Sequence, residues 1–347
     1  MRRSSAGLRR LGLASACLAV LVGVAARGQE PPAGQPATGA PRWFKGNTHT
    51  HTTESDGDST PDVVARWYRD HGYDFLVLSD HNRLTSIEAL GALAGKDDEF
   101  LLIPGEEVTS GFEGRPVHVN GLGITQLVEA QNGASVLDVL QRSVDAIRSV
   151  RGVPHINHPN FRWAFSADEI RQVRNNRLLE IYNGHPQVNN LGGGGAAGME
   201  EVWDRVLSSG SLVYGIAVDD AHNFTDPGNS NVAGPGRGWV AVRAPSLDAA
   251  SILGALEAGR FYASTGVELA DYQASPSSVT VTIKTDAWAK YRVQFIGQHG
   301  RLLHEALESP AMYQIRGDEG YVRAKILESN GRMAWCQPIL VGGHSSR

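Results

Sequence analysis

Short, fully apolar segments recur along this chain, and each is followed at once by polar residues. The clearest of them is D-F-L-V-L at 74–78, which is apolar after its first residue and precedes the polar tripeptide at 79–81. Amphipathic segments separate these runs. One of them has apolar residues at helical spacing between Pro61 at its start and Gly72 at its end. This alternation of buried strands and helices predicts a βα succession with a mainly parallel sheet.

Side chains that commonly bind metal ions gather where the predicted strands stop. In a β/α barrel, the loops after the carboxyl ends of the strands meet at one mouth, so residues far apart in sequence converge there. Six imidazoles and three carboxylates occupy such positions: His49, His51, Asp56, His81, Glu107, His118, His158, Asp220 and His222. A catalytic metal ion has roughly three protein ligands and open positions for water. The set therefore predicts a site for two or three divalent ions.

The densest part of this set is N-T-H-T-H-T-T-E-S-D-G-D at 47–58. Side chains two residues apart in an extended backbone point the same way, so His49 and His51 can chelate one ion. Asp56 follows on a turn that can fold back towards them. Alone, H-x-H also occurs as a pair of ordinary surface histidines. The other polar strand ends are what favour the metal site.

The first 28 residues have the pattern of a signal peptide, with arginines followed by a short apolar run and small residues. The run is short for a membrane span, so we expect no stable membrane insertion after cleavage. The pair Arg9 and Arg10 leaves a twin-arginine (Tat) route open beside the Sec route. We therefore expect a periplasmic or extracellular protein. Residues 29–41, rich in Pro, Gly and Ala, are interpreted as a flexible linker.

The charge balance argues against nucleic acid as a partner. The chain carries a formal charge of -5, and removal of residues 1–28, which hold five arginines and no acids, lowers it to about -10. Binding to a phosphate backbone requires a basic face. Cleavage would also leave Cys336 as the single thiol, so no internal disulfide is expected.

The sequence pattern changes at Gly266. Several segments after it alternate apolar and polar residues, turn residues separate them, and Asn330 with Gly331 is a strong hairpin signal. We predict a small antiparallel β-sandwich domain at 266–347, after a larger domain at 42–265.

Six short motifs occur in the order found in one known superfamily. They are H-T-H with Asp56, S-D-H-N, P-G-E-E, the isolated His118, N-H-P and D-D-A-H. In this order, over residues 43–265, they resemble the PHP (polymerase and histidinol phosphatase) superfamily of metallohydrolases. The resemblance implies a distorted seven-stranded, TIM-like β/α barrel that holds a trinuclear metal centre.

The resemblance also assigns the ligands to three ions. It places His49, His51, Glu107 and Asp220 on the first ion, Glu107, His118 and His158 on the second, and Asp56, His81 and His222 on the third. Glu107, not Glu106, matches the pattern P-G-x-E and would bridge two ions. With Asp220, it is our candidate catalytic carboxylate. Asp80, next to His81, would orient a metal-bound imidazole by accepting a hydrogen bond.

Three other polar residues have open interpretations. Arg237 is the basic residue that we place nearest to the mouth, as a catalytic candidate, because planar donors suit an anionic or carbonyl oxygen. A structural arginine is the alternative. His155 is interpreted as a core histidine or a support for a ligand rather than as a ligand itself. His185, in Y-N-G-H-P, either lines the substrate pocket or is a plain loop histidine.

Such a centre implies an exported metal-dependent hydrolase that needs no Ser or Cys nucleophile. A water shared between two cations loses a proton near neutral pH, and the ions polarise the P=O or C=O oxygen of the substrate. Three divalent ions, three carboxylates and one hydroxide leave about two positive charges, which suits a phosphate dianion. The expected substrate is a small phosphomonoester, although the same count allows a neutral carbamate.

Two alternatives stay open. The segment G-R-F-Y-A-S-T-G-V at 259–267 and the terminal A-W-C-Q-P-I resemble the CehA/McbA-type branch, whose named members cleave carbamate or amide bonds. A non-enzymatic alternative is an exported metal-binding or glycan-binding protein. Mixed imidazole and carboxylate ligands suit Zn, Mn or Fe. The sequence gives no indication of the oligomeric state.

Overall fold

Two sets of parallel strands form the first part of the fold, in agreement with the predicted βα succession. The elements of this part are, in chain order, β1 (Arg42–Asn47), α1 (Pro61–Asp70), β2 (Phe75–Leu78), β3 (Leu101–Phe112), β4 (Arg115–Leu122), α2 (Val136–Ser149), β5 (Val153–Ile156), α3 (Ala167–Ile170), β6 (Leu178–Asn183), α4 (Met199–Ser208) and β7 (Tyr214–Val218). β1, β2 and β3 pair in parallel, as do β5, β6 and β7.

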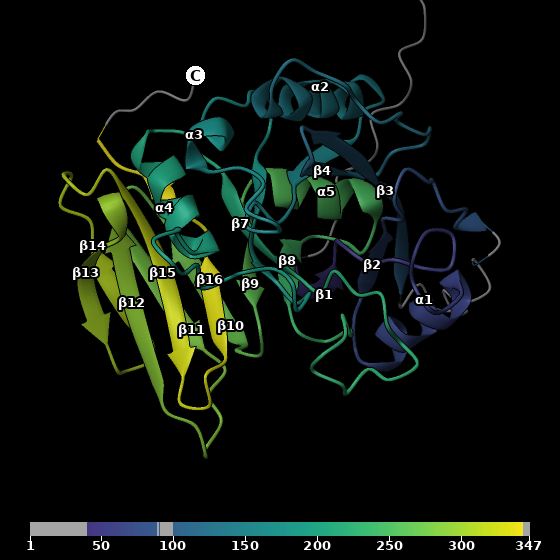
Figure 1. Ribbon diagram of the computed structural model, residues 1–347. Coiled ribbons are helices and arrows are strands. Elements are labelled where there is room, and N and C mark those ends of the chain that lie inside the picture. Colours follow the sequence, from purple (N-terminus) through teal and green to yellow (C-terminus); the bar gives the residue numbers. More distant parts are fainter. Residues whose placement is uncertain (1–39, 89, 91–99, 343–347) are drawn as a thin grey trace, which may run out of the picture. The chain divides into compact units, whose positions relative to one another are not determined.

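The computed structural model describes residues 40–88, 90 and 100–342 (Figure 1). The predicted signal peptide at 1–28 and nearly all of the predicted linker at 29–41 lie outside these residues. The described residues belong to one compact unit, and the predicted boundary at 265/266 stays a prediction. Within the described ranges, none of the helices combines the length and the hydropathy that a membrane crossing requires.

A β-hairpin interrupts the parallel order between these two sets. β3 and β4 pair antiparallel, with Phe112 opposite Arg115, and β4 also pairs antiparallel with β5. Glu113 and Gly114 form the turn with φ of 49° and 77°, because a two-residue hairpin turn of this twist requires positive φ at both positions. Glu107 and His118 therefore lie inside hairpin strands. Their predicted place at strand ends was wrong.

The remaining strands all pair antiparallel, as the alternating pattern predicts for those after Gly266. The elements are β8 (Trp239–Ala244), α5 (Ala249–Glu257), β9 (Phe261–Ser264), β10 (Leu269–Ala274), β11 (Ser278–Ile283), β12 (Tyr291–Gly297), the 3-10 turn η2 (Gln298–Gly300), β13 (Arg301–Ala306), β14 (Ala311–Gln314), β15 (Tyr321–Glu328), β16 (Met333–Cys336) and β17 (Ile339–Leu340). β8 pairs with β1 and β9, and through β9 and β16 the large sheet continues to β15, β12 and β13 (Figure 1). β10, β11 and β14 form a second sheet.

The strand pairings make a large mixed sheet with few helices. They run along one continuous path of the described strands from β13 to β7. Val281 of β11, Phe295 of β12 and Ile326 of β15 belong to one hydrophobic core, so the small sheet packs against the C-terminal part of the large one. The seven-stranded barrel and a separate sandwich domain are finer descriptions that stay predictions.

A buried ion-pair cluster joins α4 to β15. The Arg323 guanidinium donates to both carboxylate oxygens of Asp204 at 2.7 Å and to Glu200 at 2.8 Å, and only 1% of Arg323 is exposed. The Tyr321 hydroxyl also donates to Asp204, at 2.6 Å. The opposite charges compensate one another in the interior, so α4 of the first part of the fold binds firmly to β15 among the C-terminal strands.

Candidate metal centre

All nine ligand candidates lie in four overlapping groups. Each group brings potential ligand atoms within 4.8 Å of one another. The groups are His51, Asp56, His81 and His222; His49, His51 and Asp220; His49, Glu107 and His158; and His81, Glu107 and His118. His51 thus also lies in the group with Asp56, beyond the predicted division among three ions. That these residues bind metal stays a prediction.

Glu107 lies at the middle of the set. Its Oε1 is 2.9 Å from Nδ1 of His118, 3.3 Å from Nε2 of His158 and 3.5 Å from Nε2 of His49. Its Oε2 is 2.7 Å from Nδ1 of His81 and 3.5 Å from Nε2 of His51. One carboxylate in contact with five imidazoles has the position that a bridging ligand requires.

Buried side-chain atoms of the ligand set are suited to bind a cation. Among the described residues, none hydrogen-bonds to His49 Nε2 or His51 Nε2, although both atoms are buried. The two imidazole nitrogens lie 3.3 and 3.2 Å from the same oxygen of Asp220. Ligands about 2.0 to 2.2 Å from one ion stand roughly this far apart. Buried polar atoms without partners are costly, and a shared metal ion would satisfy them together.

The group around Asp56 forms the open side of the set. Asp56 Oδ1 lies 3.3 Å from Nε2 of His222, and Oδ2 lies 3.6 Å from Nε2 of His81. The Asp56 side chain is 55% exposed, whereas the side chains of His49 and Glu107 are buried. The set is therefore open to solvent on the side of Asp56.

Electrostatics at the site set the charge of each ligand. Burial and the neighbouring His222 lower the pKa of His51 to about 4, so its nitrogens are free to bind a cation. Burial acts to lower the pKa of His81, yet the adjacent Glu107 carboxylate raises it to about 9. Burial opposes ionisation of Glu107, but the imidazoles of His81 and His118 hold its pKa well below the usual range. Glu107 is thus an anion at neutral pH.

Asp220 has a strained backbone. Its φ of 50° lies in the left-handed region, which non-glycine residues rarely adopt. Its N–H donates to the carbonyl of His49 at 3.1 Å, and the Asn183 amide donates to its carboxylate at 3.0 Å. These contacts hold the carboxylate towards His49 and His51. Asp219 points elsewhere, because it accepts hydrogen bonds from Tyr68 and from the 236–238 backbone.

Glu180, which was not among the predicted site residues, is the buried partner of His49. Its Oε1 lies 2.7 Å from His49 Nδ1, and its Oε2 accepts the His158 N–H at 2.8 Å and the Asn183 amide at 2.9 Å. A single signal was present, since Glu180 is the one charged residue within the apolar strand L-L-E-I-Y. Carboxylates that orient metal-bound histidines are common.

The predicted role of Asp80 was wrong. Its carboxylate accepts hydrogen bonds from the N–H and hydroxyl of Thr52 and from the hydroxyls of Ser55 and Thr85. Asp80 therefore fixes the loop between His51 and Asp56 instead of orienting an imidazole. Proximity in sequence to His81 did not indicate where its side chain points.

Glu106 lies on the other face of β3 from Glu107. It accepts the N–H of Val128 at 2.9 Å, and burial raises its pKa to about 7. Adjacent residues of a strand point to opposite faces. The structure thus brings Glu107 into the ligand set and leaves Glu106 out, as P-G-x-E predicts. His155 is buried beside Glu180, with Nε2 3.6 Å from Oε1, and belongs to none of the four groups.

Arg237 is engaged with the backbone. Its Nη1 donates to the carbonyl of Gly184 at 3.0 Å, and its Nη2 donates to that of Asn229 at 2.7 Å. The guanidinium thus joins two loops beside the centre. The structural alternative accounts for these contacts, and direct contact with substrate stays a prediction.

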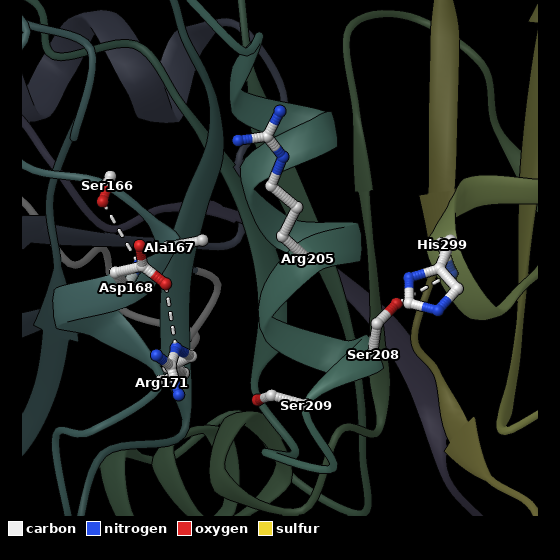
Figure 2. A pocket seen from close by; sticks show the side chains of 8 residues that line it. All are labelled: Ser166, Ala167, Asp168, Arg171, Arg205, Ser208, Ser209 and His299. Atoms are coloured by element: carbon white, nitrogen blue, oxygen red, sulfur yellow. Dashed lines mark hydrogen bonds and ion pairs between the residues drawn. The ribbon is translucent and has the colours of Figure 1, made fainter.

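Two cavities lie away from the ligand set. One, of about 350 Å³, lies between α3, α4 and η2 (Figure 2). Its two arginines already pair with acids, Arg171 with Asp168 at 3.0 Å and Arg205 with Glu201 at 2.6 Å. The other, of about 600 Å³, lies beside α4 and β15. No ligand candidate lines either cavity, so the candidate site is the ligand set.

Comparison with known proteins identifies a shared fold. No family model matches the chain. A two-domain protein from Bacteroides vulgatus, which contains a predicted PHP-like metal-dependent phosphoesterase, has a TM-score of 0.52 and 15% sequence identity; the match covers 86% of this chain and 96% of that one. At this identity the likeness shows a common fold. The chain therefore shares its fold with a protein that contains a predicted PHP-like phosphoesterase, as the motifs lead us to expect, while membership of the PHP superfamily and of its CehA/McbA-type branch stays a prediction.

Two further proteins match more weakly or over less of the chain. An amidohydrolase from Chromobacterium violaceum, solved with bound sulfate and no metal, has a TM-score of 0.37 at 15% identity, covering 54% of this chain and 89% of that one. The 5′-3′ exoribonuclease of Haemophilus influenzae is 37% identical over 79 residues, or 22% of this chain and 28% of that enzyme. The match thus spans little more than a quarter of this curated relative.

Proposed function

We propose that this protein is a metal-dependent hydrolase that cleaves phosphoester bonds. The observation that carries the proposal is the presence, within one set of nine ligand candidates, of two buried imidazole nitrogens that have no hydrogen-bond partner among the described residues, His49 Nε2 and His51 Nε2. A cluster of two or three divalent cations would satisfy this set. The PHP-type fold supports the same reading.

The side chains have distinct roles in this proposal. Bound divalent ions would supply a strong oxygen nucleophile near neutral pH and would polarise the ester oxygen. Glu107 would help to hold the ions, because its two oxygens face imidazoles on both sides. Glu180 orients His49, and the exposed side of Asp56 leaves the approach for substrate open.

The buried charge of Glu180 modifies the expected substrate. It adds a fourth carboxylate to the count, so that three divalent ions and one hydroxide would leave about one positive charge in place of two. A phosphomonoester stays our first candidate substrate, but the smaller positive charge of the centre reduces its electrostatic advantage over a phosphodiester. The sequence match with an enzyme named an exoribonuclease supports phosphoester chemistry.

The test is elemental analysis of the purified protein beside a hydrolysis screen of phosphomonoesters, phosphodiesters, aryl esters and carbamates. We expect at least two equivalents of Zn, Mn or Fe and turnover of a phosphoester, with activity lost on chelation and restored by the same metal. Turnover of carbamates or aryl esters alone would contradict the phosphoester proposal. Bound metal without turnover of any of them would favour a metal-binding protein.

We also propose that the mature protein is exported and starts near Gln29. The support is the sequence pattern of residues 1–28, arginines followed by a short apolar run. N-terminal sequencing of protein recovered from the producing cells tests this. Recovery of the chain with Met1 still in place would contradict it.

A further inference from the structure

His185 has one ring nitrogen with a defined role and one that is free. Its Nδ1 accepts the backbone N–H of Gln187 at 3.1 Å. The proton of the neutral ring must then be on Nε2, which makes that atom a donor. In the part of the chain that the structure describes, Nε2 has no hydrogen-bond partner, and it is not among the buried atoms that lack one. A solvent-accessible N–H donor results.

This donor lies beside the ligand set. The centroid of the His185 ring is 5.5 Å from that of His222, and the two rings meet edge to face. On its other side, the ring is 6.1 Å from that of Phe161, which is 5.3 Å from the ring of His158. His185 and Phe161 therefore form a row of rings that connects ligand candidates from two different groups.

Three contacts fix the position of the loop that carries His185. The His185 N–H donates to the side-chain oxygen of Asn183 at 2.8 Å, and the amide nitrogen of Asn183 donates to Asp220 at 3.0 Å. Arg237 donates to the carbonyl of Gly184 at 3.0 Å. A Cβ at Gly184 would lie 2.9 Å from both Cβ of Arg237 and the carbonyl oxygen of Asp219, so this close approach requires glycine. The loop is thus fixed relative to the ligand Asp220.

We propose that His185 is a catalytic residue whose Nε2–H donates a hydrogen bond to an oxygen of the phosphoester substrate. This inference rests on the proposed function. A fixed donor aimed at an oxygen that gains negative charge stabilises the transition state without moving when the reaction occurs. Asn183 and Arg237 are positioning residues for this donor.

The hydrogen bonding of the His185 ring excludes two other roles for this residue. His185 is not a metal ligand, because Nδ1 is occupied by the Gln187 N–H and Nε2 carries the proton. It is not a general acid, because loss of that proton would leave an imidazolate, and a second proton on Nδ1 would face the Gln187 N–H. The proton stays on Nε2 throughout, and no bond at His185 forms or breaks.

Two variants test the proposal in the metal-loaded full-length protein. His185→Phe should lower kcat/KM for the best phosphoester of the screen by about a hundredfold, the lower end for loss of one oxyanion donor. His185→Gln, which restores a side-chain N–H, should recover at least about tenfold of this. His304→Phe, at an exposed position of β13, is the control and should have no effect.

Binding of inorganic phosphate, measured by calorimetry, provides a readout that does not depend on turnover. His185→Phe should weaken phosphate binding about tenfold, in proportion to one lost charge-assisted hydrogen bond, with the metal content unchanged. Combining Arg237→Gln with His185→Phe should cost no more than His185→Phe alone, because the arginine acts through this donor.

Several outcomes would overturn the proposal. Unchanged turnover and phosphate binding in His185→Phe would show that the donor does not reach the ligand. A loss of bound metal would make His185 a ligand, and the loss of one limb of the pH–rate profile would make it a general acid. Failure of the proposed function gives a different result. If the metal-loaded wild type hydrolyses no ester, phosphate binding still tests the His185 donor. Absence of phosphate binding to that protein would overturn the His185 proposal.

Discussion

Oε1 of Glu180 lies 2.7 Å from Nδ1 of His49, and both side chains are fully buried. The contact assigns the proton of the neutral imidazole to Nδ1 and leaves the lone pair of Nε2 directed towards Glu107 and Asp220. A carboxylate outside the ligand set thus determines which nitrogen of His49 can bind a cation.

We expect graded losses when Glu180 is replaced. Glu180→Gln keeps an oxygen that accepts the His49 proton but removes the charge, and it should lower metal affinity about tenfold. Glu180→Ala also removes the orientation of the ring and should lower it about a hundredfold, at the upper end for partners of metal-bound histidines. Competition with a chromogenic chelator measures both. Equal affinities for all three proteins would contradict the orienting role.

The pair Glu107 and Glu106 provides a test within one strand. Glu107→Gln should lower hydrolysis by at least about a hundredfold, because a bridging ligand contributes more than a partner of a ligand. Glu106→Gln should stay close to wild type, since its carboxylate contacts the Val128 backbone on the opposite face. Steady-state kinetics with metal analysis check both. An inactive Glu106→Gln beside an active Glu107→Gln would show that the assignment is reversed.

The buried cluster around Arg323 should dominate stability at the junction of α4 and β15. Arg323→Met leaves Asp204 buried without its cation and should cost about 3 to 5 kcal/mol in the free energy of unfolding. Arg205→Met, on the same helix, breaks an ion pair whose side chains are both 57% exposed and should cost less than about 1 kcal/mol. Urea denaturation measures the free energy of unfolding of both variants. Similar losses in the two variants would contradict the stabilising role of the Arg323 cluster.

Glu200 makes the stability of this junction depend on pH. Burial opposes its ionisation, but Arg323 and Lys325 hold its pKa below the usual range. The unfolded chain therefore binds a proton at Glu200 more readily, so this contribution to stability is present above about pH 4.5 and is lost as the pH falls below it. Glu200→Gln should flatten the decline of Tm between about pH 5 and 3. Glu201→Gln is the control, and parallel curves for wild type and Glu200→Gln would contradict the linkage.

The turn of the β3–β4 hairpin depends on Gly114. With φ of 77° and nothing within 4 Å of an added Cβ, Gly114→Ala should cost about 1 kcal/mol through backbone conformation alone. Gly228→Ala also has open space around the new Cβ but no positive φ, and should be neutral or slightly stabilising. Denaturant unfolding tests the difference, and equal costs would contradict a conformational origin.

The residue pattern indicated the ligand set well because its chemistry is local. The spacing of His49 and His51, and the choice of Glu107 over Glu106, follow from side-chain alternation in extended backbone. The structure brings these residues together, and their binding of metal stays a prediction. The fold shared with the PHP-like structure was likewise predictable, because the motifs follow one another in the order of that superfamily.

Other features depend on contacts that sequence separation conceals. Glu180 reaches His49 across the sheet, and an acid inside an apolar strand can equally face any buried partner. Asp80 and Arg237 stand beside the ligand set, yet their hydrogen bonds go to the 52–55 loop and to two backbone carbonyls. The antiparallel β4 was missed because Glu113-Gly114 is a weaker turn signal than Asn-Gly or Asp-Gly.

The hairpin that carries Glu107 and His118 has a consequence for the order of assembly. A tight turn can bring these two residues together within microseconds, without help from the rest of the chain. His49 and Asp220 meet only when β1 and β7, which lie far apart in sequence, have both joined the sheet. Two of the nine ligand candidates are therefore brought together early, and the contact between His49 and Asp220 forms late. A metal ion bound by Glu107 and His118 alone would indicate a chain that has not finished folding. Tight metal binding would indicate a fully folded chain.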